Sequence, residues 1–295
     1  MPRVVVNGPA AWNTLVQLPA LPEPRSHTLF ASGHTDGLGG TSAGKAVTLA
    51  ALGVDVTLRT LLGDDREAGL VRAALTHPRI DVRGEPARDG RTERHVNLMA
   101  DDGGRVSVYL ELPSAVADAS PELLAGIDAA VLDLADHSRP LLARSRAAGV
   151  PVWCDVHDDD GDATYAREFA DAADVLLVSH VRLADPRAYL DARVAAGATL
   201  VVCTRGAAGA IARDAGGWWE VPVAPVDEVV DTNGAGDAFL AGLLSGVLDG
   251  LPTAAALARA SACGALAVSD PRLGAPSATT AAADVLAARV EVRRV

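Results

Sequence analysis

Short runs of β-branched and aliphatic residues alternate with Ala- and Leu-rich segments of helical length along most of the chain. A continuous apolar strand is buried on both faces, and the helix that follows supplies the cover, so this alternation predicts a parallel sheet between two helical layers. The pattern indicates an α/β fold. Strands are expected at 4–6, 54–58, 129–134, 151–154, 175–178 and 199–203, and helices at 41–52, 64–76, 138–148, 188–196, 235–248 and 253–268.

One stretch departs from this alternation. Residues 93–100 and 105–112 have polar and apolar positions in turn, and Asp-Asp-Gly-Gly joins them, which predicts a β-hairpin. No helix is available to cover it, so we expect it to lie over the C-terminal edge of the sheet, where such folds bind ligands. No Pro/Gly/Ser-rich linker divides the chain. We therefore expect one domain over 1–295, with the strands of a small lid within 12–36 and 92–112.

The composition narrows the class of partner. The chain is 49% hydrophobic, and 26 Lys and Arg face 38 Asp and Glu, a formal net charge of -12. Such a surface repels nucleic acid and anionic membranes, although one basic pocket for a small phosphate remains compatible with it. Cys154, Cys203 and Cys263 lack the spacing of a disulfide framework or a zinc site, and Cys154 and Cys203, which each end an apolar run, are expected in the core. With no signal-peptide pattern and no apolar run of membrane-spanning length, we expect a cytoplasmic protein.

Residues 231–239, Asp-Thr-Asn-Gly-Ala-Gly-Asp-Ala-Phe, precede a long apolar helix. Their small residues let backbone N–H groups turn toward one point, and the helix N-terminus adds partial positive charge, which together favour an anion. Asp237 lies beside that anion, where a second negative charge needs a chemical reason. A general base that accepts the proton of an attacking hydroxyl is one reason. The other interpretation is an acidic residue favoured by the helix dipole.

Residues 231–239 resemble the C-terminal signature of the PfkB-type carbohydrate kinases, the ribokinase family, and differ from its usual form only at the third position. Residues 39–53, a Gly-Gly pair opening a helix that ends in Leu-Gly, are similar to the family's first signature. Residues 204–209 resemble its Thr-x-Gly-x-x-Gly nucleotide loop. Order and spacing match over nearly the whole chain. The resemblance implies a ribokinase-like three-layer α/β/α sandwich with a mostly parallel sheet and a small β lid.

The resemblance also implies a role for each matching position. Asp237 would be the general base, and the backbone of Gly234, Ala235 and Gly236 would be the anion hole for the transferring phosphate. The cofactors implied are ATP and Mg²⁺, with K⁺ as a further possibility. The remaining positions are Gly39 and Gly40 at the sugar hydroxyls, Thr204, Gly206 and Gly209 at the nucleotide, Ser261 and Cys263 near the adenine, and Asp231 at a monovalent cation.

Two departures from the family's pattern concern the acceptor. Asn13 stands where relatives usually carry an Asp that binds two sugar hydroxyls, and an amide can donate as well as accept, so a different hydroxyl pattern is expected. The Asn usual in the Gly-Gly helix is Gly44 here. Lys45 follows it, and either replaces the lost amide with a charged sugar contact or is a solvated helix lysine.

A third departure concerns the metal. Residues 179–182, Ser-His-Val-Arg, stand where the family has an Asn-x-x-Glu that helps order the water shell of magnesium. Arg182 or Arg205 either neutralises phosphate charge or lies on the surface. The acidic segment 155–160 follows a strand end and is either a metal site or a solvated loop. Other candidates that follow strand ends or lie near the lid are Asp133, Asp136, His34, Asp36, Arg94, His95 and Asn97.

The prediction is an ATP-dependent phosphotransferase that acts on a hydroxyl of a small sugar, polyol or nucleoside. The lid would close over the acceptor and exclude water, which competes for the phosphoryl group. The alternative is a ligand-binding protein of the same fold with little or no kinase activity, which Asn13 and residues 179–182 favour. A dehydrogenase is disfavoured because no G-x-G-x-x-G follows the first strand. The open edge of the lid hairpin suggests a homodimer.

Overall fold

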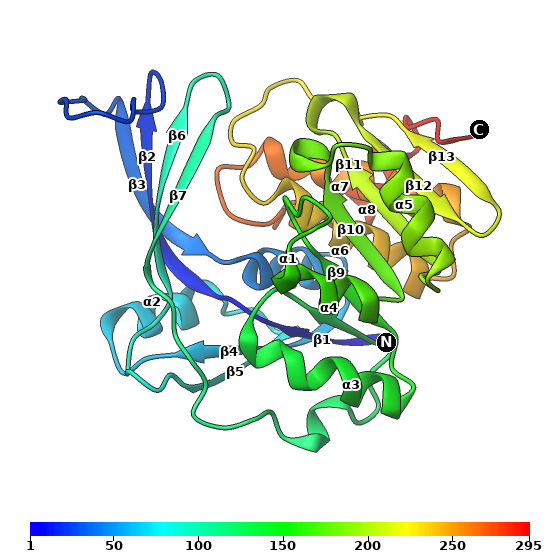
Figure 1. Ribbon diagram of the computed structural model, residues 1–295, viewed down its shortest axis with the longest axis horizontal. Helices are drawn as coiled ribbons and strands as arrows, with labels where there is room; N and C mark the ends of the chain where they lie inside the picture. Colours follow the sequence, from blue (N-terminus) through cyan, green and yellow to red (C-terminus); the bar gives the residue numbers. More distant parts are fainter.

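The first strand, β1 (Arg3–Asn7), shows why the central sheet needs cover on both faces. In the computed structural model, which describes residues 1–295, Val4 and Val6 pack into a core of 31 buried residues, whereas Val5 packs into a second core of 23. Successive side chains of a strand point to opposite faces of the sheet, so a continuous apolar run needs a hydrophobic core on each face. The three-layer arrangement follows from this requirement (Figure 1).

The large sheet has ten strands in the order β14-β13-β12-β11-β10-β9-β8-β1-β4-β5. From β11 to β5 every neighbouring pair is parallel, and the last three strands at the other edge are antiparallel, so the expected mostly parallel sheet is confirmed. The strands that follow β1 are β4 (Asp55–Leu62), β5 (Ile80–Pro86), β8 (Ala129–Leu132), β9 (Val152–Asp155), β10 (Val175–Ser179), β11 (Leu200–Thr204), β12 (Ala210–Asp214), β13 (Gly217–Val221) and β14 (Arg293–Arg294).

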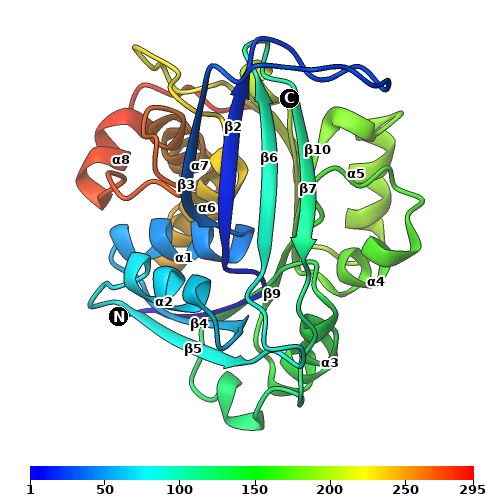
Figure 2. The same cartoon turned by 90° about the vertical axis from the view of Figure 1, so that its left-hand side faces the viewer.

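Helices cover both faces of this sheet, as Figure 2 shows. One layer contains α3 (Arg139–Ala148), α4 (Thr164–Ala172) and α5 (Pro186–Ala195). The other contains α1 (Thr41–Ala51), α2 (Arg66–Ala74), α6 (Ala235–Leu248), α7 (Thr253–Val268) and α8 (Thr280–Ala287). The apolar α6 is enclosed between the sheet, α1 and α7. A Cβ on Gly242 would lie 2.8 Å from Cys263 Sγ, so this glycine permits the close approach of α7.

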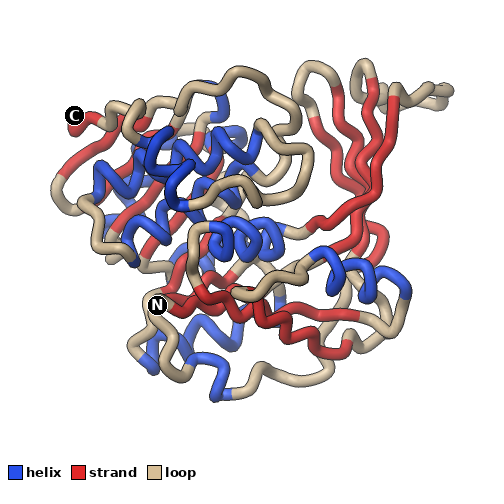
Figure 3. The backbone as a smooth tube through the Cα atoms, turned by 180° about the vertical axis from the view of Figure 1, so that it is seen from behind, coloured by secondary structure: helices blue, strands red, loops and turns tan.

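A second sheet of four strands stands apart from the first, at one end of the molecule (Figure 3). The predicted hairpin is confirmed as an antiparallel pair, and this sheet is called the lid below. The lid begins four residues after β1 ends, so it rises from the C-terminal edge of the large sheet. Its strands, in the order β3-β2-β6-β7, are β3 (Gly33–Gly39), β2 (Ala11–Leu18), β6 (Arg94–Ala100) and β7 (Arg105–Glu111).

Several elements differ from the sequence-based expectation. The strand expected at 129–134 ends at Leu132, because the next residue, Asp133, is drawn into contacts with α1. The elements β5, α4, α8 and the β12–β13 hairpin had no predicted counterpart, and β5 has exposed and half-buried residues throughout. All three cysteines are free and buried, which confirms the core positions predicted for Cys154 and Cys203. None of the helices combines the length and apolarity needed to cross a bilayer.

The burial of α6 makes a stability prediction. Leu244 is fully buried in the larger core, whereas Val247, one turn further along, is 46% exposed. Leu244→Ala should lower the free energy of unfolding by about 2–5 kcal/mol because it leaves a cavity. Val247→Ala should change it by less than about 0.5 kcal/mol. Urea denaturation of both variants compares them, and equal losses would contradict the packing described for α6.

Candidate functional site

The carboxyl ends of three central strands and the N-termini of two helices meet at one edge of the large sheet. β1 lies between β4 and β8, so the chain crosses to one side of β1 first and to the other side later. A parallel sheet opens a crevice at such a reversal, beyond the carboxyl ends of its strands. α1 and α6 both begin at this edge, next to each other. The crevice therefore forms wherever this topology is adopted, and its chemistry depends on the residues placed there.

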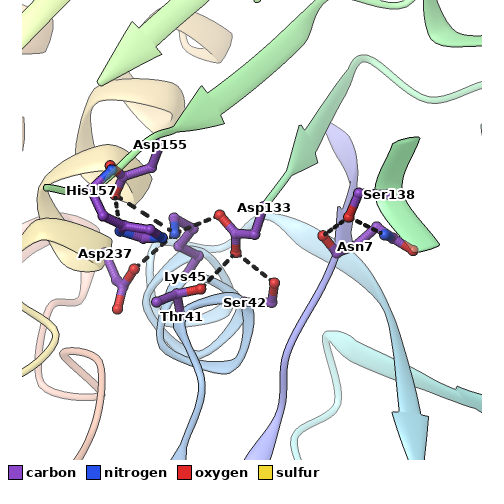
Figure 4. Close-up of polar contacts among 9 residues, drawn as sticks. All are labelled: Asn7, Thr41, Ser42, Lys45, Asp133, Ser138, Asp155, His157 and Asp237. Carbon is purple, nitrogen blue, oxygen red and sulfur yellow. Dashed lines mark hydrogen bonds and ion pairs between the residues drawn. The ribbon is translucent and has the colours of Figure 1, made fainter. Parts of the chain in front are cut away.

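Lys45 is the centre of the polar contacts in the crevice (Figure 4). Its side chain is fully buried, and its ammonium Nζ lies 2.7 Å from Asp133 Oδ1, 2.8 Å from Asp237 Oδ1 and 3.8 Å from Asp155 Oδ2. Asp133 directly follows β8, Asp155 ends β9, and Asp237 lies in the first turn of α6. Four elements distant in the sequence thus contribute one charge each to a single cluster. The alternative of a solvated helix lysine is wrong, because no part of this side chain reaches solvent.

The start of α1 holds Asp133 in place. Asp133 Oδ2 accepts hydrogen bonds from Ser42 Oγ at 2.5 Å and from Thr41 Oγ1 at 3.1 Å. Gly8 makes this approach possible, because a Cβ at that position would lie 2.4 Å from Ser42 Oγ and 2.8 Å from Asp133 Cβ. Its φ of +151° also lies in the region that favours glycine. Both oxygens of the Asp133 carboxylate are therefore engaged, one by the hydroxyls and one by Lys45.

The carboxylate of Asp155 contacts His157, which lies next to the cluster. Its Oδ1 accepts the backbone N–H of His157 at 2.9 Å, and its Oδ2 lies 3.4 Å from His157 Nδ1. His157 has a φ of 53° and is the only non-glycine residue with a left-handed backbone. Such a conformation costs about 1–3 kcal/mol and persists where surrounding contacts impose it. Here the turn directs the imidazole toward the carboxylates.

The charges of the cluster influence one another. The pKa of Asp237 is raised to about 6, because burial and the nearby Asp133 together outweigh the opposing effect of Lys45. The pKa of Asp133 is lowered, because Lys45 and the hydroxyl of Ser42 outweigh its burial. Burial would lower the pKa of Lys45, but the carboxylates around it raise that pKa above its ordinary range. Lys45 is therefore always charged, and Asp237 is the carboxyl that changes charge near neutral pH.

The turn before α6 has the geometry of an anion site. Gly234 precedes the helix with a φ of 77°, and no atom lies within 4 Å of a Cβ built on Gly236. The Ala235 N–H makes only a 3.4 Å bond to the Thr232 carbonyl, and the next two N–H groups have no acceptor in the chain. Asp237 Oδ2 lies 3.9 Å from a Cβ position on Gly234 and accepts no hydrogen bond within the chain. One carboxylate oxygen is thus free next to unpaired backbone donors.

The residues expected at the sugar side have contacts of their own. Asn13 is buried on β2, and its Oδ1 accepts the backbone N–H of His95 at 3.1 Å. A Cβ on Gly39 would lie 2.0 Å from Asn13 Nδ2, and one on Gly40 would lie 2.4 Å from the Pro9 carbonyl. Gly40 is therefore needed by the backbone itself, and Gly39 leaves room for the side chain of Asn13. Their contact with an acceptor stays a prediction.

On the nucleotide side, Thr204 ends β11, and the following turn uses Gly206 and Gly209 at φ values of 55° and 81°. A Cβ on Gly209 would lie 2.2 Å from the Val221 carbonyl, so only glycine fits there. Ser261 Oγ donates to the Pro222 carbonyl at 2.7 Å and accepts the Ala224 N–H at 2.9 Å. Ser261 thereby ties α7 to the chain after β13. Its proximity to an adenine stays a prediction.

Neither candidate arginine is a free cation. Arg182 Nη2 lies 2.7 Å from Asp160 Oδ2, and Arg205 Nη2 lies 2.7 Å from Glu220 Oε2. Residues 179–182 form the end of β10 and a short 3₁₀ helix without a carboxylate. Asp136 is exposed and paired with Arg139, so it does not reach the cluster.

A cavity of about 990 Å³ separates the lid from the body. Leu15, Gln17 and Met99 line it from the lid, and Asp231 lines it from the segment before α6. At its rim Arg105 Nη1 of β7 lies 3.4 Å from Asn233 Oδ1, so the lid touches the segment next to the anion site. Of the lid candidates, Asp36 also lines this cavity and accepts the Thr14 hydroxyl at 2.5 Å.

The residues in the crevice do not form a metal centre of their own. No group of three or more His, Cys, Asp or Glu side chains is arranged to hold an ion. The three carboxylates that converge surround the Lys45 ammonium instead. Asp231 Oδ1 accepts the Asn233 N–H at 2.8 Å. A monovalent cation at Asp231 stays a prediction.

Sequence reasoning named each member of the cluster but not their association. Asp133 and Asp155 are candidates because they follow strand ends, and Lys45 is predicted either as an acceptor contact or as a solvated helix lysine. The signal that could have joined them is the apolar context of Lys45, since its neighbours in α1 are almost all buried. A charged residue on a buried helix face requires a counter-charge. The strand ends at Asp133 and Asp155 are the nearest sources.

Comparison with known proteins gives one consistent picture. The profile of the pfkB family carbohydrate kinases matches residues 20–280. Acarbose 7(IV)-phosphotransferase from Actinoplanes sp. is 32% identical over 280 residues, which cover 91% of this chain and 92% of that protein. ATP-dependent ribose-1-phosphate kinase from Halopiger xanaduensis is 34% identical over an alignment of 311 positions, which covers 99% of each chain. A solved microbiome-derived acarbose kinase superposes with a TM-score of 0.83 at 26% identity, covering 98% and 99% of the two chains.

The buried cluster predicts a pH-dependent stability defect. Lys45→Met would leave three carboxylates without their cation and should lower the free energy of unfolding by about 3–5 kcal/mol at pH 8. In this variant the folded-state pKa values of the carboxyls lie above their unfolded values, so the folded state takes up protons as the pH falls. The deficit relative to the parent should therefore shrink toward pH 5.

Urea denaturation at pH 8 and pH 5 measures this deficit. Arg83→Met is the control, because Arg83 is exposed and paired only with exposed Asp81. Its loss should stay below about 1 kcal/mol at both pH values. A deficit in Lys45→Met that is constant with pH would show that lost packing, and not charge, explains it.

Proposed function

Since the chain belongs to the pfkB family of carbohydrate kinases, we propose that it transfers a phosphoryl group from ATP to a hydroxyl of a small carbohydrate in the crevice beneath the lid, with Asp237 as the general base. The observation that carries this proposal is the free Oδ2 of Asp237 beside the unpaired N–H groups at the start of α6. A base and an anion site are adjacent there, as phosphoryl transfer to an alcohol requires.

The proposed reaction moves one proton and exchanges one bond at phosphorus. The acceptor hydroxyl gives its proton to Asp237, and its oxygen forms a bond to the γ-phosphorus while the bond from that phosphorus to the bridging oxygen breaks and ADP leaves. The backbone of Gly234, Ala235 and Gly236 would stabilise the negative charge on the transferring group. A base with a pKa of about 6 is deprotonated at neutral pH and is stronger than an ordinary aspartate.

The charge of the crevice supports an acceptor without a phosphate group. Three aspartates, the proposed base among them, converge in the crevice, and the single Lys45 ammonium is already engaged by them. A sugar phosphate would bring a further negative charge toward this surplus of carboxylates. We therefore propose an uncharged carbohydrate acceptor, as the similarity to an acarbose phosphotransferase and an acarbose kinase also suggests, in preference to the ribose 1-phosphate named for another relative.

We extend the proposal to cofactors and assembly. Magnesium would enter on the nucleotide, held by phosphate oxygens and water, because the crevice offers no protein metal centre. Potassium would bind near Asp231, and the protein would act in the cytoplasm. Val106, Val108 and Leu110 of β7 are exposed on an edge strand of the lid, which supports a homodimer formed through the lid.

A panel of acceptors tests the substrate class. ADP release is measured with ATP and magnesium against neutral oligosaccharides, monosaccharides, nucleosides and ribose 1-phosphate, with and without potassium. We expect turnover on a neutral carbohydrate that exceeds turnover on ribose 1-phosphate at least tenfold. Preference for the sugar phosphate would contradict the charge argument. ATP binding without turnover on any acceptor would favour the alternative, a ligand-binding protein.

Replacement of the base tests the mechanism. Asp237→Asn keeps the shape of the side chain and removes its ability to accept a proton, so kcat should fall by about 10²–10⁴-fold. Nucleotide affinity measured by calorimetry should change less than threefold, because the amide leaves the backbone turn intact. Asp191→Asn, on the surface of α5 and paired with Arg213, is the matched control. Unchanged turnover in Asp237→Asn would exclude it as the base.

A further inference from the structure

We propose that Lys45 is the positioning residue of the base: its ammonium holds Asp237 Oδ1, which leaves Oδ2 as the atom that accepts the proton, and Asp133 anchors the ammonium from the opposite side. This inference rests on the proposed function of Asp237. It assigns to Lys45 a role through the base and not through the acceptor.

The choice of residue is the first support. The chain has 26 basic residues of Lys or Arg, and Lys45 is its only lysine. Every other basic position of this kind is an arginine, and most of these arginines are at least partly exposed. A chain that uses arginine everywhere else, but a fully buried lysine here, indicates that this position requires an ammonium. Its compact charge fits between two carboxylates, whereas the planar guanidinium of arginine is larger and donates in a fixed fork.

The geometry gives the second support. Lys45 Nζ has three protons, and two carboxylate oxygens lie at hydrogen-bond distance from it, Asp133 Oδ1 at 2.7 Å and Asp237 Oδ1 at 2.8 Å. Asp133 cannot rotate away, because its other oxygen accepts the hydroxyls of Ser42 and Thr41. The ammonium is therefore fixed, and it fixes one oxygen of Asp237 in turn. Rotation of the base about its χ2 would break an ion pair between buried groups.

The neighbouring glycine gives the third support. A Cβ on Gly44 would lie 3.1 Å from Asp237 Oδ2 and 3.3 Å from Asp237 Cβ. Two consecutive residues of α1 therefore face the two oxygens of Asp237. Gly44, which has no side chain, lies next to Oδ2, and the ammonium of Lys45 contacts Oδ1. The two oxygens of the base are distinguished by this pair, Gly44 and Lys45.

The charged groups around the base contribute with opposite signs. They are Lys45 from α1, Asp133 after β8, and Asp155 with His157 from β9 and its following turn. Lys45 and His157 favour the charged form of Asp237, and Asp133 disfavours it. Removal of Lys45 should therefore shift the acidic limb of the pH profile upward, and removal of the charge on Asp133 should shift it downward. If Lys45 had a purely structural role, its removal and the removal of the charge on Asp133 would not shift the acidic limb in opposite directions.

Isotope labelling tests the contact itself, with the full-length protein and no substrate. Lysine labelled with ¹³Cε and ¹⁵Nζ reports Lys45 alone, because no other lysine exists. Its resonance should shift with an inflection near pH 6 as Asp237 titrates, and Asp237→Asn should abolish that inflection. A resonance that ignores pH between 5 and 8, or the same inflection in Asp237→Asn, would overturn the ion pair.

Kinetics test the positioning role. In Lys45→Met the acidic limb of kcat/KM should move up by about 1–3 pH units, so that kcat/KM falls by roughly 2- to 100-fold at pH 7 and recovers toward pH 9. In Asp133→Asn the limb should move down. If Lys45→Met folds poorly, Lys45→Gln at 10 °C provides the same comparison, and Asp191→Asn again serves as the control for an unshifted profile.

The outcomes separate this inference from the proposed function. Loss of turnover in Asp237→Asn, with an unshifted pH profile in Lys45→Met, overturns the role of Lys45 and keeps the base. Equal losses in Lys45→Met at every pH also overturn it. Full activity in Asp237→Asn overturns the proposed function first, whatever the Lys45 variants do.

Discussion

One ammonium among three carboxylates determines how the central elements of this protein meet. Lys45 lies on α1, and its partners lie at the ends of β8 and β9 and at the start of α6, so the ion cluster joins two neighbouring strand ends to two helix N-termini, next to the point where the strand order reverses. Removing Lys45 would leave buried carboxylates without a counter-charge. The crevice is thus held together by the same charges that equip it for chemistry.

Close approach of backbone segments around the same cluster is the second constraint. Gly8 lets β1 approach Asp133 and Ser42, and Gly40 lets the start of α1 pass the Pro9 carbonyl. These contacts bring two helix N-termini to one edge of the sheet, where their dipoles favour anions. The carboxylate of Asp237, the proposed base, would be repelled by a phosphate bound there. The Lys45 ammonium reduces that repulsion, which explains how a carboxylate and an anion site can share one crevice.

The sequence predicted the fold well because its signals were local. Apolar runs such as 175–178 and 199–203 can be recognised one at a time, and α6 and α7 were predicted with the bounds that the structure shows. The site depends on contacts between distant segments, and a single sequence does not show which strand end faces which helix. The contact of Lys45 with Asp133, 88 residues later, therefore has no counterpart in the sequence-based prediction, which offers a sugar contact or a solvated helix lysine. Edge elements such as β5 were missed because half-buried residues carry a weaker pattern.

The lid and α1 form one continuous piece of chain. β3 ends at Gly39 and α1 begins at Thr41, so a single residue, Gly40, separates a strand that covers the crevice from the helix that carries Lys45. Gly40 has a φ of 91°, and the Pro9 carbonyl occupies the place that a Cβ would need, so no bulkier residue fits there. A movement of the lid would therefore also displace the start of α1, whose Thr41 and Ser42 hold Asp133.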